Sequence, residues 1–408
     1  MKKNSLLFLS LLINLCCGEA PKHEKHSVSG EKKAGDANNT IRVGAEQTEK
    51  YLPLIKNKRI ALAANHTSMI GSVHLADSMI SMGVNIRVIL APEHGFRGTA
   101  DAGEKVDDGI DRKTGVRIVS LYGKHQKPDK KDLHGIDLVI FDIQDVGARY
   151  YTYISTMHFI MEACAENAVP LLILDRPNPN GFYVDGPVLE KKYTSFSGMH
   201  PVPIVHGLTV AEYACMINGE RWLKNGVQCK LTYITAEHYS HRDLYSLPVK
   251  PSPNLPDMTS VYLYPSLCLF EGTVVSVGRG TKRPFQIIGY PGFTNEDFSF
   301  TPVSIEGSAK NPLYEGKLCG GLDIIRDAEL HKINIHRLQL SWLKTMYQNF
   351  PNKKKFFNDY FNHLAGNSTL KQQIINDVSE NEIKQGWEPG IKKFKFIRKK
   401  YLLYEDFE

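Results

Sequence analysis

The sequence of 408 residues lacks the glycine-rich loops with which most α/β proteins bind nucleotide phosphates. No G-x-G-x-x-G follows the first predicted strand, and no G-x-x-x-x-G-K-[ST] occurs along the chain. These loops bring backbone N–H groups and a helix N-terminus to the phosphates. The segment Gly278-Arg279-Gly280-Thr281 is rich in glycine but fits neither pattern. The sequence therefore predicts no nucleotide cofactor.

Signatures of several other classes of protein are missing as well. Serine hydrolases of the α/β class carry G-x-S-x-G at a sharp turn, and this pattern does not occur. Most of the cysteines lie beyond residue 20 at wide and irregular spacings, which argues against a structural zinc site and a disulfide framework. The net charge of +6 is spread along the chain, and no run of Lys and Arg is interleaved with aromatic residues in the way that a nucleic-acid groove needs, so nucleic acid is not an expected partner.

No uninterrupted apolar run reaches the roughly 18 residues that a membrane-spanning helix needs. The first 20 residues combine two lysines, the apolar segment Leu6–Leu15 and small residues before Ala20, which is the order of a secretory signal peptide. Cleavage after Ala20 and lipidation of Cys16 or Cys17 are alternative processing routes. We therefore expect an exported protein, periplasmic or an outer-membrane lipoprotein, whose only membrane contact is an N-terminal lipid.

After a polar and flexible leader at residues 21–40, short apolar runs alternate with helical patterns. Such runs, bounded by turns, are typical of strands that are buried on both faces. Their alternation with helices predicts a Rossmann-like, doubly wound and mainly parallel sheet. We expect strands at residues 59–64, 86–91, 116–121, 138–143, 170–174 and 229–234, and helices at residues 72–82, 150–168 and 210–222, with Tyr153 on a buried stripe.

The chain is long enough for two domains. We predict that residues 41–290 form the Rossmann-like catalytic domain and residues 291–408 a smaller C-terminal α+β domain with a helix at 337–347. The chain ends in a basic and aromatic segment. Its alternating Phe394 and Phe396 fit an amphipathic strand or helix against the core better than a membrane contact.

Polar and ionisable residues follow five of the predicted strands at their carboxyl ends. In open parallel sheets, ligands bind in the crevice beyond these ends, beside the helix N-termini. One such residue is readily explained as a loop contact, but all five groups together indicate a functional site. The groups are Asn65 and His66; Glu93, His94 and Arg97; Tyr122; Asp142, Gln144, Asp145 and Arg149; and Arg176 and Asn178.

The carboxylates of this rim fit glycoside hydrolysis, which needs an acid to protonate the leaving oxygen and usually a second group on the opposite face. Glu93 lies in a loop stiffened by Pro92 and Gly95, where burial and neighbours can tune its pKa for the role of acid. A salt bridge with Arg97 is the alternative for this residue. Glu271 follows an apolar run at a predicted helix end, where the helix dipole disfavours a carboxylate, so its presence there needs a reason.

A metal-dependent hydrolase is a second interpretation of the rim. His66, His94, Asp142 and Asp145 lie on neighbouring predicted loops and could gather around a cation. Because no pair of them has a tight ligand spacing such as H-x-x-x-H, we predict no metal.

Several long segments resemble the hallmark motifs of the bacterial exo-β-N-acetylmuramidase family, formerly a domain family of unknown function. The resemblance extends from residue 40 to the C-terminus. It implies a peptidoglycan-recycling glycosidase that releases N-acetylmuramic acid from the non-reducing end of cell-wall fragments. It also implies a Rossmann-like catalytic domain with a smaller C-terminal domain, and no nucleotide or metal. The segments are APEHGFRG (91–98), FDIQDVGARYYTY (141–153), DRPNPNGFYVDGP (175–187), PSPNLP (251–256) and YPSLCLFEGT…SVGRGT…PF (264–285).

By this resemblance, Glu93 in the P-E-H-G-F motif is the catalytic acid. Glu271 is the second carboxylate, as a base or a stabiliser, and Asp142 or Asp145 could fill that role instead. The 2-acetamido group of the substrate could also act as the nucleophile, and the second carboxylate would then orient it.

The substrate that the resemblance implies, a muropeptide or the disaccharide of N-acetylmuramic acid and N-acetylglucosamine, carries a lactyl carboxylate. A guanidinium binds a carboxylate through two parallel hydrogen bonds, and Arg149, Arg176 and Arg279 are the candidates. For Arg149, an ion pair with Asp145 is the alternative. The remaining predicted substrate-binding residues are Tyr150, which could stack on the sugar, and Asn65, His66, His94, Arg97, Gln144, Asn178 and Thr281.

Two other functions remain as alternatives. The rim could bind muropeptides without cleaving them, in a non-catalytic exported protein of the same fold. Alternatively, the protein could be a metal-dependent hydrolase of another cell-wall bond, such as an amide or an ester.

Overall fold

The computed structural model describes residues 40–97, 108–294 and 298–408. The predicted signal peptide and almost all of the leader therefore lie outside the described residues. The structure divides into two units, Met1–Thr40 and Ile41–Glu408, and only the second is described below.

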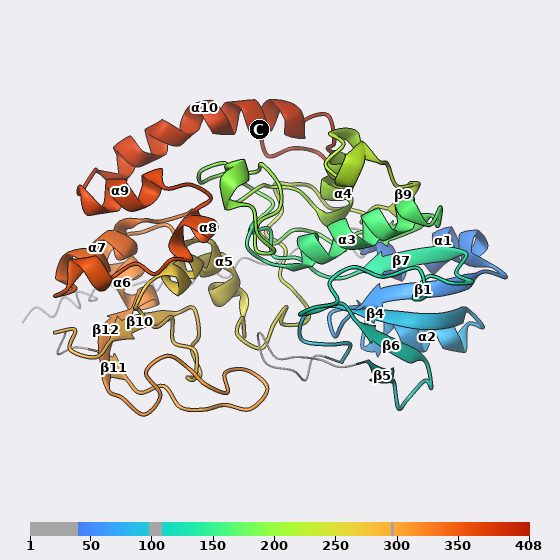
Figure 1. Cartoon of the computed structure of the whole chain (residues 1–408), viewed down its shortest axis with the longest axis horizontal. Helices are drawn as coiled ribbons and strands as arrows, with labels where there is room; N and C mark the ends of the chain where they lie inside the picture. The colour runs from blue at the N-terminus through green and yellow to red at the C-terminus, as the bar shows by residue number, and fades with distance from the viewer. Residues whose placement is uncertain (1–39, 98–107, 295–297) are drawn as a thin grey trace, which may run out of the picture. The chain divides into compact units, whose positions relative to one another are not determined.

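A sheet of seven strands forms the first half of this unit (Figure 1). Its order is β5-β6-β4-β1-β7-β8-β9, and every neighbouring pair is parallel except β5 and β6. The order reverses between β1 and β7, which is the topological switch point of a doubly wound sheet. The predicted fold class is confirmed. The strands are β1 (Arg59–Ala64), β4 (Asn85–Ala91), β5 (Gly109–Ile110), β6 (Arg117–Ser120), β7 (Leu138–Asp142), β8 (Leu171–Leu174) and β9 (Leu231–Ile234).

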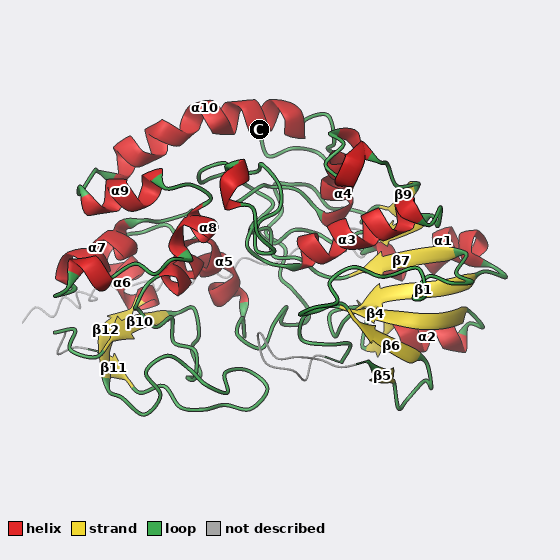
Figure 2. Cartoon of the chain, viewed as in Figure 1, coloured by secondary structure: helices red, strands yellow, loops and turns green. Residues whose placement is uncertain are grey.

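The central strands are apolar on both sides because helices cover both faces of the sheet (Figure 2). Along β1, Ala61 and Ala63 pack into one hydrophobic core, and Ile60 and Leu62 pack into the other. Helices α3 (Tyr153–Glu166) and α4 (Val210–Gly219) contribute to the first core, and helices α1 (Thr48–Ile55) and α2 (Leu75–Ser81) to the second.

The predicted helix at 72–82 begins later than its periodicity indicates. Val73–His74 (β3) pairs with Met69–Ile70 (β2) as a short antiparallel ribbon, and this pairing keeps the chain extended. The imidazole of His74 then accepts a hydrogen bond from the backbone N–H of Ala76 and caps α2.

The second half of the unit is smaller and mixes helices with an antiparallel sheet of order β10-β12-β11. Its apolar residues belong to the same core as α3 and α4, so hydrophobic packing is continuous between the two halves. The predicted domain boundary near residue 290 stays a prediction. The elements are α5 (Met258–Leu267), the 3-10 helix η4 (Cys268–Gly272), β10 (Ile287–Tyr290), β11 (Ser299–Phe300), β12 (Cys319–Asp323), α6 (Ile324–His331), α7 (Ser341–Asn349), α8 (Phe361–Ala365), α9 (Thr369–Ile375) and α10 (Glu380–Arg398); the remaining 3-10 helices are η1 (Gly44–Glu46), η2 (Lys191–Tyr193), η3 (Lys224–Gly226) and η5 (Lys353–Lys355).

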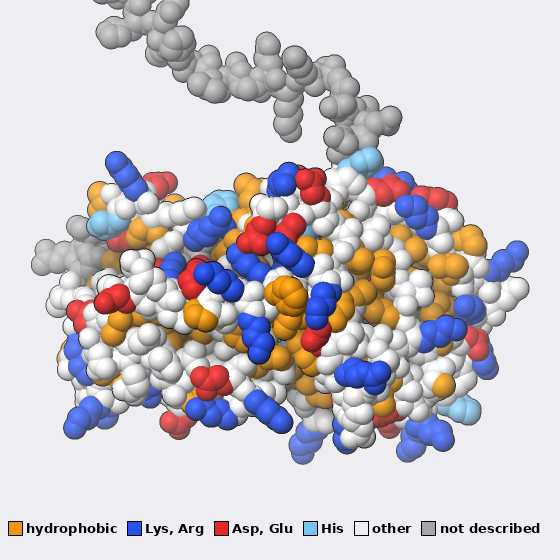
Figure 3. Space-filling view, turned by 90° about the horizontal axis from the view of Figure 1, so that it is seen from above, with side chains coloured by type: hydrophobic (Ala, Val, Ile, Leu, Met, Phe, Trp, Pro, Cys, Tyr) orange, Lys and Arg blue, Asp and Glu red, His pale blue; other side chains and the backbone are white. Residues whose placement is uncertain are grey.

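The basic and aromatic end of the chain forms the last turns of α10 and a segment that folds back onto the first half. Phe394 is buried and Phe396 is exposed, as expected for an amphipathic helix against the core. On the face seen in Figure 3, positive side chains are interspersed with negative ones. Lys395 of this segment forms an ion pair with Glu408. Among the described helices, none combines the length and apolarity needed to cross a membrane.

Hydrogen bonds fasten the end of α10 and the segment after it to loops of the first half. The guanidinium of Arg398 donates to the carbonyl of Gly207 at 2.7 and 3.0 Å and pairs with Asp406. The hydroxyl of Tyr404 donates to the buried carboxylate of Asp175 at 2.6 Å and accepts from the backbone N–H of Ala236 at 2.8 Å.

Candidate active site

A cavity of about 220 Å³ opens where β4, β6 and β7 end, at the carboxyl edge of the sheet. Its other wall comes from α5, η4 and α8 of the second half. The lining residues are Glu93, His94, Tyr122, Tyr150, Tyr151, Thr152, Tyr153, Phe196, Ser197, Ser252, Asn254, Leu255, Tyr264, Cys268, Glu271, Arg279, Phe285, Tyr360 and Leu364.

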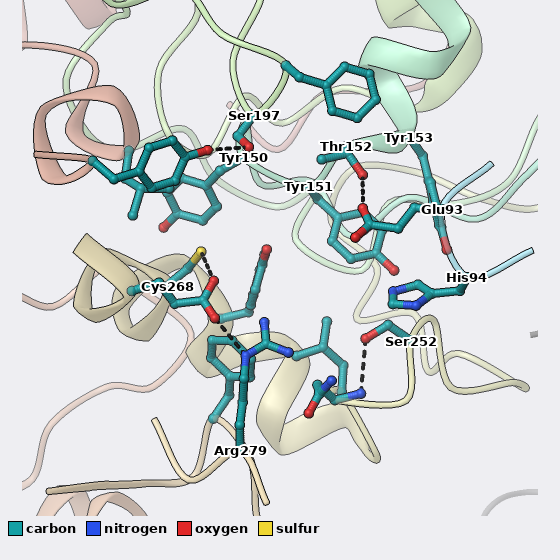
Figure 4. A pocket seen from close by; sticks show the side chains of 18 of the residues that line it. Glu93, His94, Tyr150, Tyr151, Thr152, Tyr153, Ser197, Ser252, Cys268 and Arg279 are labelled. Carbon is teal, nitrogen blue, oxygen red and sulfur yellow. Dashed lines mark hydrogen bonds and ion pairs between the residues drawn. The ribbon is translucent and has the colours of Figure 1, made fainter. Parts of the chain in front are cut away.

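Glu93 stands on the sheet side of this cavity, two residues after β4. His94 and Gly95 have φ angles of 69° and 74°, so the chain turns sharply directly after the glutamate. The hydroxyl of Thr152 donates a hydrogen bond to Glu93 Oε2 at 2.8 Å (Figure 4). Burial, together with the charge of Glu93 and a hydrogen bond to it, raises the pKa of Tyr122. Glu93 is therefore held by two hydroxyl groups, that of Tyr122 just after β6 and that of Thr152 at the start of α3.

Glu271 stands on the opposite wall, at the end of η4. The Nε of Arg279 donates to Glu271 Oε1 at 2.7 Å, and the thiol of Cys268 donates to Oε2 at 3.7 Å. The side chain of Asn358 also donates to the backbone carbonyl of Glu271. The guanidinium supplies the compensation that a carboxylate needs at a helix end.

Aromatic side chains form much of the wall between these two carboxylates. The hydroxyls of Tyr150 and Tyr151 donate to the backbone carbonyls of Pro265 and Pro251, which fixes both rings. Tyr153, which the helical spacing assigned to packing, is buried and also lines the cavity. Rings that present apolar faces beside polar edges are suited to the flat face of a sugar.

Comparison with known proteins identifies the family. A family model described as exo-β-N-acetylmuramidase NamZ, N-terminal, matches residues 60–259, and the corresponding C-terminal model matches residues 262–404. The chain belongs to the NamZ family. The peptidoglycan β-N-acetylmuramidase NamZ of Bacillus subtilis (strain 168) is 38% identical in an alignment of 375 residues, which covers 87% of this chain and 89% of that protein.

Solved structures agree with this assignment to the NamZ family. A DUF1343 family protein from Bacteroides fragilis NCTC 9343 is 47% identical and superposes with a TM-score of 0.83, covering 90% of this chain and 99% of that chain. A second DUF1343 family protein from the same organism is 25% identical with a TM-score of 0.77, covering 90% and 100% of the two chains. The predicted family resemblance is confirmed.

The cavity of this NamZ-family chain brings together some of the predicted site residues. Glu93, His94, Tyr150, Glu271 and Arg279 all line it, although the last two lie about 180 residues beyond the first in the sequence. These five come from both halves of the chain.

Two predicted carboxylates lie elsewhere, beneath the strand ends. Asp142 is fully buried and accepts two hydrogen bonds from the guanidinium of Arg176, at 2.6 and 2.9 Å. The two charges therefore compensate each other inside the fold. Asp145 is also buried, and its Oδ1 accepts from the backbone N–H of Gly147 at 2.7 Å. Its Oδ2 has no partner among the described residues, and burial raises the pKa of Asp145 to about 7.

The two other rim arginines are also bound within the protein. Arg149 is buried without a carboxylate partner and donates to four backbone carbonyls at 2.7 to 2.9 Å, and burial lowers its pKa to about 10. The alternative pairing with Asp145 does not form. Arg97 forms ion pairs with Asp77 and Asp111.

The remaining predicted substrate-binding residues hold loops in place and do not line this cavity. Burial lowers the pKa of His66 to about 4, so its imidazole is neutral when it contacts the carbonyl of Lys250. Thr281 closes the glycine-rich turn by donating to the carbonyl of Gly278 at 2.7 Å. Asn65 accepts from Thr67, Gln144 donates to the carbonyls of Asp145 and Pro177, and Asn178 donates to the carbonyl of Leu208.

The cavity also holds residues that were not predicted from the sequence. Asn254 lies in the PSPNLP segment, and its amide nitrogen donates to the carbonyl of Ser308 at 2.7 Å. Its buried amide oxygen has no partner among the described residues. Ser197 and Tyr360 join the two halves by a hydrogen bond of 2.6 Å and carry no recognisable sequence signal. No group of three or more His, Cys, Asp or Glu side chains in the described part of the chain is arranged to hold a metal ion.

Proposed function

We propose that the protein is an exo-acting glycoside hydrolase that releases N-acetylmuramic acid from the non-reducing end of peptidoglycan fragments. One observation carries the proposal: Glu93, held by two hydroxyl groups, faces the pair Glu271–Arg279 across a cavity walled by tyrosines. Membership of the NamZ family and the activity named for the relative from Bacillus subtilis support this reaction.

Glu93 acts as the catalytic acid in this proposal. Its carboxyl group gives a proton to the glycosidic oxygen as the bond from that oxygen to C1 of N-acetylmuramic acid breaks. Water then supplies a hydroxyl group to C1 and returns a proton to Glu93, so one water molecule is consumed for each bond. The hydroxyl of Thr152 fixes the orientation of the carboxyl group toward the cavity.

The substrate class in this proposal is a muropeptide or the disaccharide of N-acetylmuramic acid and N-acetylglucosamine. Such a sugar brings a 2-acetamido group, whose N–H needs an acceptor when water is excluded. The amide oxygen of Asn254 is fixed in the cavity wall and lacks a partner among the described residues, so it is a suitable acceptor. An exported location, periplasmic or as an outer-membrane lipoprotein, would place the enzyme beside this substrate.

The test uses the protein from residue 41 onward, a nitrophenyl β-N-acetylmuraminide, the matching N-acetylglucosaminide and the natural disaccharide. We expect cleavage of the muraminide in preference to the glucosaminide. Replacement of Glu93 by Gln should lower kcat on the disaccharide by about 10²- to 10⁴-fold, the usual contribution of a general acid. The loss should be smaller on the nitrophenyl sugar, because nitrophenolate leaves without help from an acid.

Glu49 offers the matched control, because it is an exposed glutamate of α1 outside the cavity. Glu49→Gln should keep full activity. If Glu93→Gln lowers kcat equally on the disaccharide and on the nitrophenyl sugar, Glu93 is not the catalytic acid. Binding of muropeptides without cleavage would instead establish a non-catalytic wall-binding protein.

A further inference from the structure

The guanidinium of Arg279 is only partly used by the protein. Its Nε donates to Glu271, and its Cζ lies 5.1 Å from the ring centroid of Phe285. No group of the described residues accepts a hydrogen bond from its two terminal nitrogens. The side chains of Arg279 and Glu271 are 27% and 31% exposed, so the pair faces the cavity and is not sealed in the core. The terminal edge of this guanidinium is therefore available to a ligand.

Arg279 is the one arginine or lysine among the described residues that line the cavity. Arg176 is saturated by Asp142, and Arg149 by four backbone carbonyls. In Figure 4 the Arg279 side chain rises from the lower wall toward the centre of the cavity, with Glu93 and Thr152 beyond it. A negatively charged substituent on a bound sugar would meet this cation in the cavity.

The backbone around Arg279 is built to hold it in one place. Gly278 and Gly280 on either side have φ angles of 77° and 80°, in the region that favours glycine. A Cβ at Gly280 would lie 2.6 Å from the carbonyl oxygen of Val303, and a Cβ at Gly278 would lie 2.5 Å from Ile287. The sequence pattern G-R-G-T is thus required by the turn that presents the arginine.

Both carboxylate oxygens of Glu271 are engaged, one by Arg279 and the other by the thiol of Cys268. This arrangement orients the guanidinium through its Nε. The two terminal nitrogens then present parallel N–H groups, which can donate to a second carboxylate. It also neutralises the glutamate, which would otherwise repel an anionic substrate in the same small cavity.

We infer that the terminal edge of Arg279 binds the lactyl carboxylate of N-acetylmuramic acid, and that Glu271 is a positioning residue for this arginine and not the second catalytic carboxylate. The inference rests on the proposed function, because it names the group of the substrate that the same cavity recognises. N-acetylglucosamine lacks the lactyl group, so the pair gives the enzyme its preference between the two sugars.

The experiment measures kcat/KM on the nitrophenyl muraminide and glucosaminide for Arg279→Met, Arg279→Lys and Glu271→Gln. Loss of a charge-assisted hydrogen-bonded pair should lower the muraminide value in Arg279→Met by about 10- to 100-fold and leave the glucosaminide value nearly unchanged. Arg279→Lys should keep part of the preference, because an ammonium retains charge without the planar fork. Glu271→Gln should reduce the muraminide preference by about 3- to 10-fold, through misplacement of the guanidinium.

Arg283→Met is the matched control, because Arg283 lies two residues beyond the same turn and pairs with Asp323. It should leave the ratio between the two sugars unchanged. Glu271→Gln that lowers kcat equally and by more than about 10³-fold on both sugars would overturn the inference, since it would make Glu271 a catalytic group. An unchanged sugar preference in Arg279→Met would overturn it as well.

Calorimetric titration with free N-acetylmuramic acid and N-acetylglucosamine, in the Glu93→Gln background, separates this inference from the proposed function. A preference for N-acetylmuramic acid that disappears in Glu93→Gln/Arg279→Met supports the carboxylate site even if the protein cleaves nothing. Cleavage of the muraminide with equal binding of both sugars supports the hydrolase and overturns the carboxylate site.

Discussion

At the scale of the residue, the strand-end carboxylates differ by the partner that each one meets. Asp142 meets a guanidinium, Glu93 meets hydroxyl groups, and Asp145 meets backbone N–H groups with its Oδ2 unpaired among the described residues. The sequence places all three on one rim because parallel strands end together. It does not reveal which of them points into the cavity, because this depends on partners far away in the chain, such as Arg176 for Asp142.

Asp145 should make stability depend on pH. Its folded pKa of about 7 exceeds the unfolded value of about 3.9, so the folded state keeps a proton that the unfolded state has lost. The stability that it contributes is fully present below pH ~4 and is lost as pH rises through 7. Asp145→Asn removes this pH-dependent loss of stability, because an amide does not titrate in this range. From pH 5 to pH 8, the free energy of unfolding of the variant should rise by ~3 kcal/mol relative to the parent. Urea titrations at the two pH values measure the difference.

Asp137→Asn is the control for this pH effect. Hydrogen bonds from Arg59 hold the pKa of the half-buried Asp137 below its usual range, so the contribution of Asp137 to stability does not change between pH 5 and pH 8. If the difference in the free energy of unfolding between Asp145→Asn and the parent is the same at pH 5 and pH 8, Asp145 is ionised in the folded protein.

At the scale of the element, the central strands were predictable and the turns were not. The run at 59–64 coincides with β1, and the other parallel strands shift by one or two residues, because burial on both faces leaves a continuous apolar run. The G-R-G-T turn matched no known loop. Its two glycines are required because Ile287, Val303 and Pro312 approach them too closely for a side chain, and these residues are not adjacent to the turn in the sequence. The sequence thus identified Arg279 as a candidate without the means to choose it over Arg149 and Arg176.

Gly280→Ala should disturb the turn that carries Arg279. The new methyl group would meet the Val303 carbonyl and Pro312 at 2.6 Å in a backbone region that disfavours alanine. We expect a loss of ~1–3 kcal/mol in the free energy of unfolding and a weaker preference for the muraminide. Gly316→Ala is the matched control, because Gly316 has a φ of 69° but nothing within 4 Å of its added Cβ. Identical behaviour of the two variants would contradict the steric argument.

At the scale of the whole molecule, the chain end fastens the second half back onto the first. Tyr404 reaches Asp175, whose pKa burial raises to about 6, and Arg398 reaches Gly207. Amphipathic periodicity predicted that the end of the chain packs on the core, but not where it packs, because the contacts span 191 and 229 residues of sequence.

Removal of one hydroxyl should weaken this attachment. Tyr404→Phe leaves the buried carboxylate of Asp175 and the N–H of Ala236 without their partner, which should cost ~1–3 kcal/mol of unfolding free energy. Tyr401→Phe is the control, because the hydroxyl of Tyr401 donates to the more exposed Glu220, and it should cost less than ~1 kcal/mol. Urea unfolding of the three proteins measures both values, and a greater loss for Tyr401→Phe would be inconsistent with this account.

The cavity is assembled from residues on both sides of the junction between the two family-matched regions, with Glu93 before it and Glu271 and Arg279 after it. Exchange of the second region between relatives would therefore replace the residues that we infer to recognise the sugar, Glu271 and Arg279, and would keep the proposed proton donor, Glu93. New sugar preferences could then arise by recombination at this junction while the bond-breaking step is inherited unchanged. The continuous hydrophobic core sets the limit, because only partners with matching packing would fold after such an exchange.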